Sequence, residues 1–108
     1  VTSARLTPET LREEVELADI LLHCSPIGMH PNENQSLVAP ELLGDGLAVF
    51  DAVYNPRHTK LLQDAENAGC RTILGMEMFL GQAYVQFEQW TGVEAPRRVM
   101  REIVEEKL

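Results

Sequence analysis

The sequence predicts an α/β fold in which a parallel sheet of about three to four strands is flanked by helices and followed by two C-terminal helices. Short apolar runs at 19–24, 47–54 and 70–74 alternate with helical patterns, and strands that alternate with helices form parallel sheets through right-handed crossovers. The centres of the first two runs are continuously apolar, which is typical of strands that are buried on both faces. A chain of 108 residues is long enough for one domain of this kind, over residues 1–108.

The expected helices have recognisable start and stop signals. Thr7-Pro8-Glu9 combines an N-cap residue, a proline at the first helical position and a carboxylate in the first turn. Gly69 and Gly92 are placed to end the second and third helices, because glycine adopts the left-handed conformation that closes a helix. We expect helices from 8 to about 18, from about 58 to 68, from 75 to 92 and from 95 onward, with one helical turn at 40–43; residues 1–3 could be the tail of a strand.

The helix that follows Gly75 carries two stripes. Met78 and Gln82 are four residues apart, so they project from one face. On periodicity alone, the simpler interpretation is that Met78 is filler and that Gln82 belongs to a solvated face. The neighbouring stripe is expected to face the core, with its last member anchoring the C-terminal helices; it consists of Phe79, Ala83, Phe87 and Trp90.

Composition excludes several classes of function. The formal net charge is -8 and the pI about 4.7, which argues against nucleic acid or an anionic membrane as the main partner, since both need clustered basic residues. No apolar run approaches the roughly 20 residues that span a bilayer. Cys24 and Cys70 form no CxxC motif, so we expect a reduced, cytoplasmic setting in which both act as small hydrophobic residues. His23, Cys24, His30 and His58 lack metal-ligand spacing, so no metal site is expected.

Three stretches at the ends of the expected strands are the least generic in the chain. In open parallel sheets, ligands bind outside the carboxyl ends of the strands. These ends carry residues 25–29, 54–56 and 75–82, which should therefore converge on one edge of the sheet. Asp51, near the end of the second strand, is expected to cap a nearby loop rather than to transfer protons.

Taken in order, these stretches resemble the C-terminal half of shikimate dehydrogenase. That family carries an Asn-Ala-Thr-x-x-Gly-Met strand end, an Asp-x-x-Tyr-x-Pro-x-x-Thr-x-Leu-Leu segment, a Gly-x-x-Met-Leu/Phe-x-x-Gln helix entry and a Phe-x-x-Trp-Thr/His-Gly close. The matching segments here are His23–Met29, Asp51–Leu62, Gly75–Gln82 and Phe87–Gly92. The resemblance extends over nearly the whole chain from about Asp19, and the shared order and spacing make it specific.

The resemblance implies a three-layer partial Rossmann-like fold and NADPH-dependent reduction of 3-dehydroshikimate to shikimate, in aromatic amino-acid biosynthesis. It implies that Gln82 hydrogen-bonds substrate hydroxyls and that Tyr54 contacts the carboxylate region of the substrate. It also implies that the backbone at Gly75 and the side chain of Met78 border the nicotinamide of NADP, and that Ser25 lies near the cofactor. A neutral amide can both donate to and accept from a polyol, and a thioether packs softly against an aromatic ring.

The chain departs from the family pattern in two ways. His23-Cys24-Ser25 replaces Asn-Ala-Thr; Ser25 keeps a hydroxyl, and His23 is either a site residue or, the interpretation we favour, a structural substitution. The larger departure is that nothing here corresponds to the N-terminal substrate domain, which holds the family's catalytic Lys and Asp, or to the Gly-rich turn for the cofactor phosphates. We expect no catalytic residue in this chain, an N-terminal half as its partner, and no turnover by the chain alone.

Two alternatives stay open. A quinate/shikimate dehydrogenase carries the same motifs and can use NAD. A non-catalytic assembly module could also retain the fold, and half of a doubly wound sheet leaves an uncovered strand edge that favours self-association.

Overall fold

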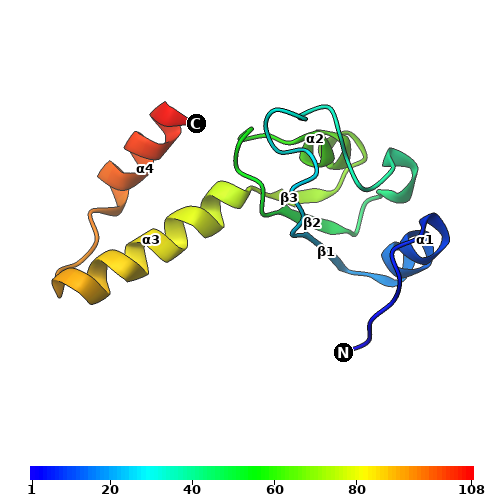
Figure 1. Ribbon diagram of the computed structural model, residues 1–108, viewed down its shortest axis with the longest axis horizontal. Coiled ribbons are helices and arrows are strands. Elements are labelled where there is room, and N and C mark those ends of the chain that lie inside the picture. Colours follow the sequence, from blue (N-terminus) through cyan, green and yellow to red (C-terminus); the bar gives the residue numbers. More distant parts are fainter.

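The computed structural model describes all of residues 1–108 and confirms the predicted α/β class (Figure 1). Three strands form one parallel sheet in the order β1-β2-β3. Residues 1–3 form no strand. In chain order the elements are α1 (Pro8–Leu17), β1 (Ile20–His23), the 3₁₀ turn η1 (Pro40–Leu42), β2 (Ala48–Asp51), α2 (Lys60–Asn67), β3 (Arg71–Ile73), α3 (Gly75–Thr91) and α4 (Arg97–Lys107).

The helix ends predicted at Thr7, Gly69 and Gly92 are present, and Thr59 adds a cap that was not predicted. Thr7 accepts a hydrogen bond from the backbone N–H of Thr10 at 3.1 Å and starts α1. Thr59 does the same for α2 through the N–H of Leu62. Gly92 ends α3 in the left-handed conformation at φ 69°, which a residue with a Cβ adopts only with strain.

The strand register aligns the carboxyl ends of the sheet. His23 pairs with Asp51 at the ends of β1 and β2, and Phe50 pairs with Ile73 at the end of β3. The segments that follow these strands therefore leave the sheet side by side, as the sequence predicts.

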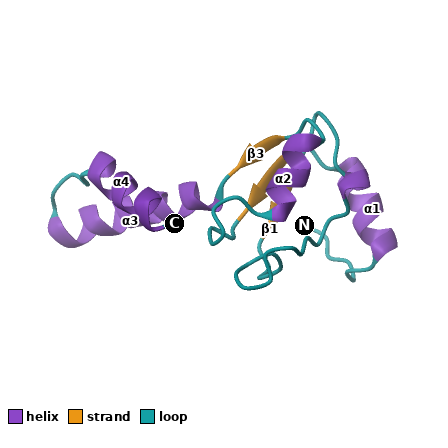
Figure 2. Ribbon diagram, turned by 90° about the horizontal axis from the view of Figure 1, so that it is seen from above, coloured by secondary structure: helices purple, strands orange, loops and turns teal.

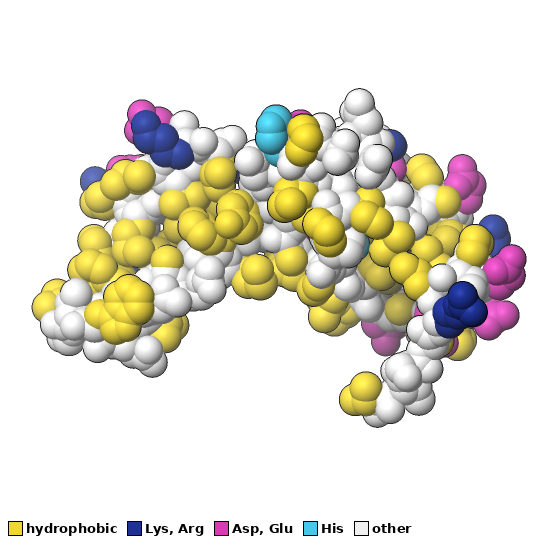
Figure 3. Space-filling model, viewed as in Figure 1, with side chains coloured by type: hydrophobic (Ala, Val, Ile, Leu, Met, Phe, Trp, Pro, Cys, Tyr) yellow, Lys and Arg dark blue, Asp and Glu magenta, His cyan; other side chains and the backbone are white.

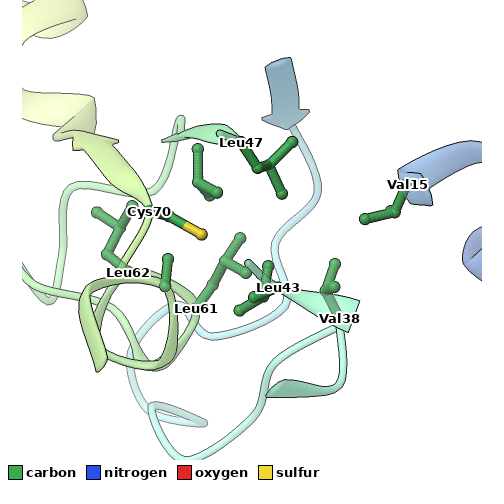
Figure 4. Packing of buried hydrophobic residues seen from close by; sticks show 9 residues of the cluster. Val15, Val38, Leu43, Leu47, Leu61, Leu62 and Cys70 are labelled. Atoms are coloured by element: carbon green, nitrogen blue, oxygen red, sulfur yellow. The ribbon is translucent and has the colours of Figure 1, made fainter. Parts of the chain in front are cut away.

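The hydrophobic core lies on one face of the sheet. Leu62 and Ala65 of α2 and Val49 of β2 have no exposed surface, and Val15 of α1 joins the same cluster. In Figure 4, Leu61 of α2 lies next to Leu43, with Val38 nearby and Val15 further out on α1. In Figure 2, α2 lies along the sheet and α1 lies beyond it.

The other face of the sheet is open. The side chains of Ile20 and Leu22 on β1 are 59% and 65% exposed. The expectation that this strand is buried on both faces is therefore wrong for this chain by itself. A continuous apolar run shows that both faces favour burial, but the chain supplies a helical layer for only one of them.

Helices α3 and α4 form an arm that extends from the sheet, with α4 folded back along α3 (Figure 1). The inward residues of α3 are Met76 and Leu80, each 1% exposed, while Trp90 is 79% exposed. The predicted core stripe is half-buried at Phe79, Ala83 and Phe87 and wrong at Trp90, because only the first turns of α3 reach the sheet. Apolar side chains remain visible along the arm and over the middle of the molecule (Figure 3). No helix has the length and apolar character needed to cross a membrane.

Candidate functional site

A buried chain of hydrogen bonds crosses the ends of β1 and β2. The Nδ1 atom of His23 lies 2.8 Å from Oδ1 of Asp51, and the Nε2 atom of His23 lies 2.5 Å from the hydroxyl of Ser25. His23 is 5% exposed and Asp51 is fully buried. The register places His23 opposite Asp51, so two side chains that are far apart in the sequence meet at the carboxyl edge.

Asp51 is held by two further donors. The backbone N–H of Val53 donates to Oδ1 at 3.0 Å, and the Thr59 hydroxyl donates to Oδ2 at 2.6 Å. The expectation that Asp51 caps a loop is confirmed by its bond to Val53. The same carboxylate also orients His23, which the sequence interpretation missed.

An open depression of about 400 Å³ adjoins these hydrogen-bonded side chains through Ser25. Ser25 and Tyr54 both contribute to its lining, as does Cys24, which is exposed rather than packed as a hydrophobic residue. Cys70, in contrast, is buried in the core as expected. The complete lining is Cys24, Ser25, Pro26, Met29, His30, Ala52, Val53, Tyr54 and Asn55.

Tyr54 links the end of β2 to α3. Its ring lies over that of Phe79, with centroids 4.7 Å apart and the ring planes inclined by 31°. Offset aromatic pairs at this separation are favourable, so Tyr54 is positioned by the first turns of α3.

Gly75 permits α3 to begin directly against the end of β2. A Cβ atom at this position would lie 2.5 Å from the carbonyl oxygen of Asp51 and 2.8 Å from two backbone atoms of Ala52. Only a residue without a side chain allows this approach. Gly75 thereby brings α3 next to Tyr54 and to the buried Asp51.

Met78 and Gln82 lie on α3 outside the depression. Met78 is 48% exposed and Gln82 is also exposed; neither is part of the depression lining. The structure therefore brings Ser25, Tyr54 and Gly75 to one edge and leaves Met78 and Gln82 on the adjoining helix, open to a partner.

An ion pair fixes α4 to the first turn of α3. The two terminal guanidinium nitrogens of Arg101, Nη1 and Nη2, donate to the Glu77 carboxylate at 2.8 and 2.7 Å. The hydrogen bond from Arg101 lowers the pKa of Glu77, opposed by partial burial, and the Glu77 carboxylate in turn raises the pKa of Arg101. The pair joins the arm's two helices close to Met78.

The comparisons with a family model, with curated proteins and with solved structures all find proteins described as shikimate dehydrogenases. The family model described as "Shikimate 5'-dehydrogenase C-terminal domain" matches residues 75–105. A shikimate dehydrogenase (NADP(+)) of Methanosarcina acetivorans is 45% identical over 98 residues, which cover 91% of this chain and 35% of that protein. The chain thus spans about a third of the length of the curated relatives it matches.

Two solved structures share the fold of this chain. A shikimate 5-dehydrogenase from Listeria monocytogenes, in complex with shikimate and NAD, has a TM-score of 0.81 and 38% identity, over 89% of this chain and 34% of that chain. A quinate dehydrogenase from Corynebacterium glutamicum, in complex with NAD, has a TM-score of 0.84 and 31% identity, over 91% of this chain and 34% of that chain.

Proposed function

This chain belongs to the shikimate dehydrogenase family, of which it corresponds to the C-terminal part, and we propose that it forms the nicotinamide side of that enzyme's active site and part of its substrate site. The reaction is the NADPH-dependent reduction of 3-dehydroshikimate to shikimate, in aromatic amino-acid biosynthesis. The observation that carries the proposal is the convergence of Ser25, Tyr54 and Gly75 at the carboxyl edge of a parallel sheet, where such folds bind ligands.

The residues present suit one end of a dinucleotide. The depression offers a largely apolar lining with a hydroxyl at Ser25, and Met78 offers an exposed thioether on α3, outside the depression. A flat nicotinamide ring fits such surroundings. The chain has no Gly-rich turn for the phosphates, which the N-terminal half would supply. When bound, the reduced cofactor supplies the hydride, while Ser25, Gly75 and Met78 orient and shield its ring.

Gln82 and Tyr54 are proposed to hold the substrate. The Gln82 amide is exposed on α3 and can donate to one substrate hydroxyl while accepting from another. The Tyr54 phenol is half-buried and its ring is fixed against Phe79, so its hydroxyl is available to the carboxylate region of the substrate at little entropic cost. The acid and base that transfer the proton belong to the N-terminal half.

The test is reconstitution. The purified chain is mixed with shikimate and NADP+ at mildly alkaline pH, alone and after addition of the N-terminal half of a family member, and NADPH formation is followed by absorbance. We expect no turnover by the chain alone and turnover by the mixture. Gln82→Ala should abolish most of the restored activity, whereas Gln86→Ala, an exposed glutamine one turn further along α3, should not. Turnover without the added half, or none with it, would contradict the proposal.

A quinate dehydrogenase is the second candidate, favoured by the structural similarity to the Corynebacterium glutamicum enzyme. The two are separated in the same assay by offering quinate and NAD+ in place of shikimate and NADP+. Because the phosphate-reading residues lie outside this chain, the added half must come from a source that accepts both cofactors.

We further propose that the isolated chain self-associates and that it acts in the cytoplasm, where the free thiols of Cys24 and Cys70 stay reduced. β1 is an edge strand whose side chains Ile20 and Leu22 are exposed, and unpaired apolar edges favour pairing with a second copy. Sedimentation should show a dimer or larger species that dissociates when Leu22→Lys places a charge on this face. A monomer at all concentrations would exclude self-association.

A further inference from the structure

The hydrogen bonds that link Asp51, His23 and Ser25 determine which way the Ser25 hydroxyl points. Oδ1 of Asp51 accepts the N–H of Val53 at 3.0 Å and lies 2.8 Å from Nδ1 of His23. Since Oδ1 is an acceptor for Val53, it accepts from His23 as well, and the proton of a neutral imidazole therefore lies on Nδ1. This leaves a lone pair on Nε2.

The lone pair on Nε2 faces the Ser25 hydroxyl. The Nε2 atom of His23 lies 2.5 Å from the Ser25 oxygen, so the serine donates its proton to His23. The backbone N–H of Ile27 donates to the same oxygen at 3.3 Å. One lone pair of Ser25 remains, and Ser25 lines the depression.

We propose that His23 is a positioning residue that, together with Asp51, fixes Ser25 as a hydrogen-bond acceptor toward the ligand. A free serine hydroxyl rotates and serves both donors and acceptors, whereas this one selects an N–H or O–H donor. This inference rests on the proposed function: the donor that Ser25 selects is the carboxamide N–H₂ of the nicotinamide. Burial of His23 and of Asp51 makes the arrangement rigid, because rotating either side chain would leave a buried polar atom without a partner.

The proton positions are tested on the chain itself, without cofactor. In ¹⁵N-labelled chain, at about two pH units above the ordinary imidazole value, long-range ¹H–¹⁵N spectra distinguish protonated from unprotonated ring nitrogens. We expect His23 to carry its proton on Nδ1, protected from exchange, and to keep Nε2 unprotonated. The exposed His30 and His58 serve as internal references, and Ser25→Ala should leave the Nδ1 proton in place. A His23 proton on Nε2 would overturn the proposal.

The ligand side is tested in the reconstituted enzyme. Ser25→Ala and His23→Phe should each raise KM for NADP+ by about 2- to 10-fold, the usual value of one hydrogen bond, with kcat within about twofold. Because His23 acts through Ser25, the double variant should have the KM of Ser25→Ala alone. Ser25→Thr should restore binding, and His58→Gln should change nothing. An unchanged KM in His23→Phe beside a raised KM in Ser25→Ala would refute the positioning role.

Two outcomes separate this proposal from others. Absence of turnover in the reconstituted wild type would refute the proposed function, while the spectra would still decide the placement of the His23 proton. A serine bonded to a histidine that is oriented by an aspartate also has the arrangement of an activated nucleophile. Stoichiometric labelling of Ser25 by a fluorophosphonate, lost in His23→Phe, would show that the hydroxyl gives up its proton and would overturn the acceptor role.

Discussion

Replacing Gly75 by alanine tests how α3 is joined to the sheet. The added Cβ would lie 2.5 Å from the Asp51 carbonyl oxygen, about 0.9 Å inside the 3.4 Å at which ordinary contacts begin. The atoms in its way are backbone atoms at the end of β2, so no side-chain rotation relieves the overlap. The start of α3 or the end of β2 must move instead.

Overpacking of this kind costs about 1–3 kcal/mol, which lowers the melting temperature of a domain of this size by about 5–20 °C. The matched control is Gly81→Ala in the middle of α3, where a Cβ would meet no atom within 4 Å. That substitution should stabilise the chain by about 0.5–1 kcal/mol, because alanine loses less backbone freedom than glycine in a helix.

Urea unfolding, followed by far-ultraviolet circular dichroism, measures both variants on the 108-residue chain. Opposite signs for the two substitutions would confirm the close approach. Equal stability of Gly75→Ala and the wild type would refute it, and with it the placement of Tyr54 against Phe79, which depends on the same junction. Because Gly75 also borders Asp51, Gly75→Ala should in addition expose the Nδ1 proton of His23 to exchange.

Three further predictions concern the arm and the thiols. Arg101 lowers the pKa of Glu77 below its ordinary value of 4.5, so the ion pair stabilises the arm above pH 4.5 and is lost as the pH falls through the lowered pKa. Measuring the free energy of unfolding of the chain against pH should show this loss. Arg101→Gln should remove the pH dependence, whereas Arg98→Gln, at a side chain that is 88% exposed, should not. Trp90→Ala should change the free energy of unfolding by no more than about 0.5 kcal/mol, as for other exposed positions, and the single tryptophan should be fully open to acrylamide quenching; a blue-shifted, protected emission would contradict this. Cys24 should react with a thiol reagent in the folded chain while Cys70 reacts only on unfolding, and equal rates for the two would show that the core around Cys70 is open.

Local chemistry made the elements predictable from the sequence. The caps at Thr7 and Gly92 need only neighbouring residues, and the structure has both. The carboxyl-edge site followed from strand order, since parallel strands end at the same edge. Ser25 and Tyr54 accordingly line one depression.

Tertiary contacts explain what the sequence did not reveal. A helical period describes which residues of α3 share a face, but not how far along the helix the sheet extends, so Trp90 was expected inside and lies outside. The pairing of His23 with Asp51 depends on the register between two strands 28 residues apart. The position of both residues at the ends of their strands could have predicted this pairing, because adjacent parallel strands end side by side.

The arm also has a mechanical consequence. α3 rises about 1.5 Å per residue, so its 17 residues make a lever of roughly 25 Å that starts at Gly75. A tilt of about 10° at that base would carry Thr91 through about 4 Å, Gln82 through about 2 Å and Met78 through less than 1 Å. A contact that changes the tilt of the far end of the arm would therefore move Gln82 while leaving Met78 almost fixed.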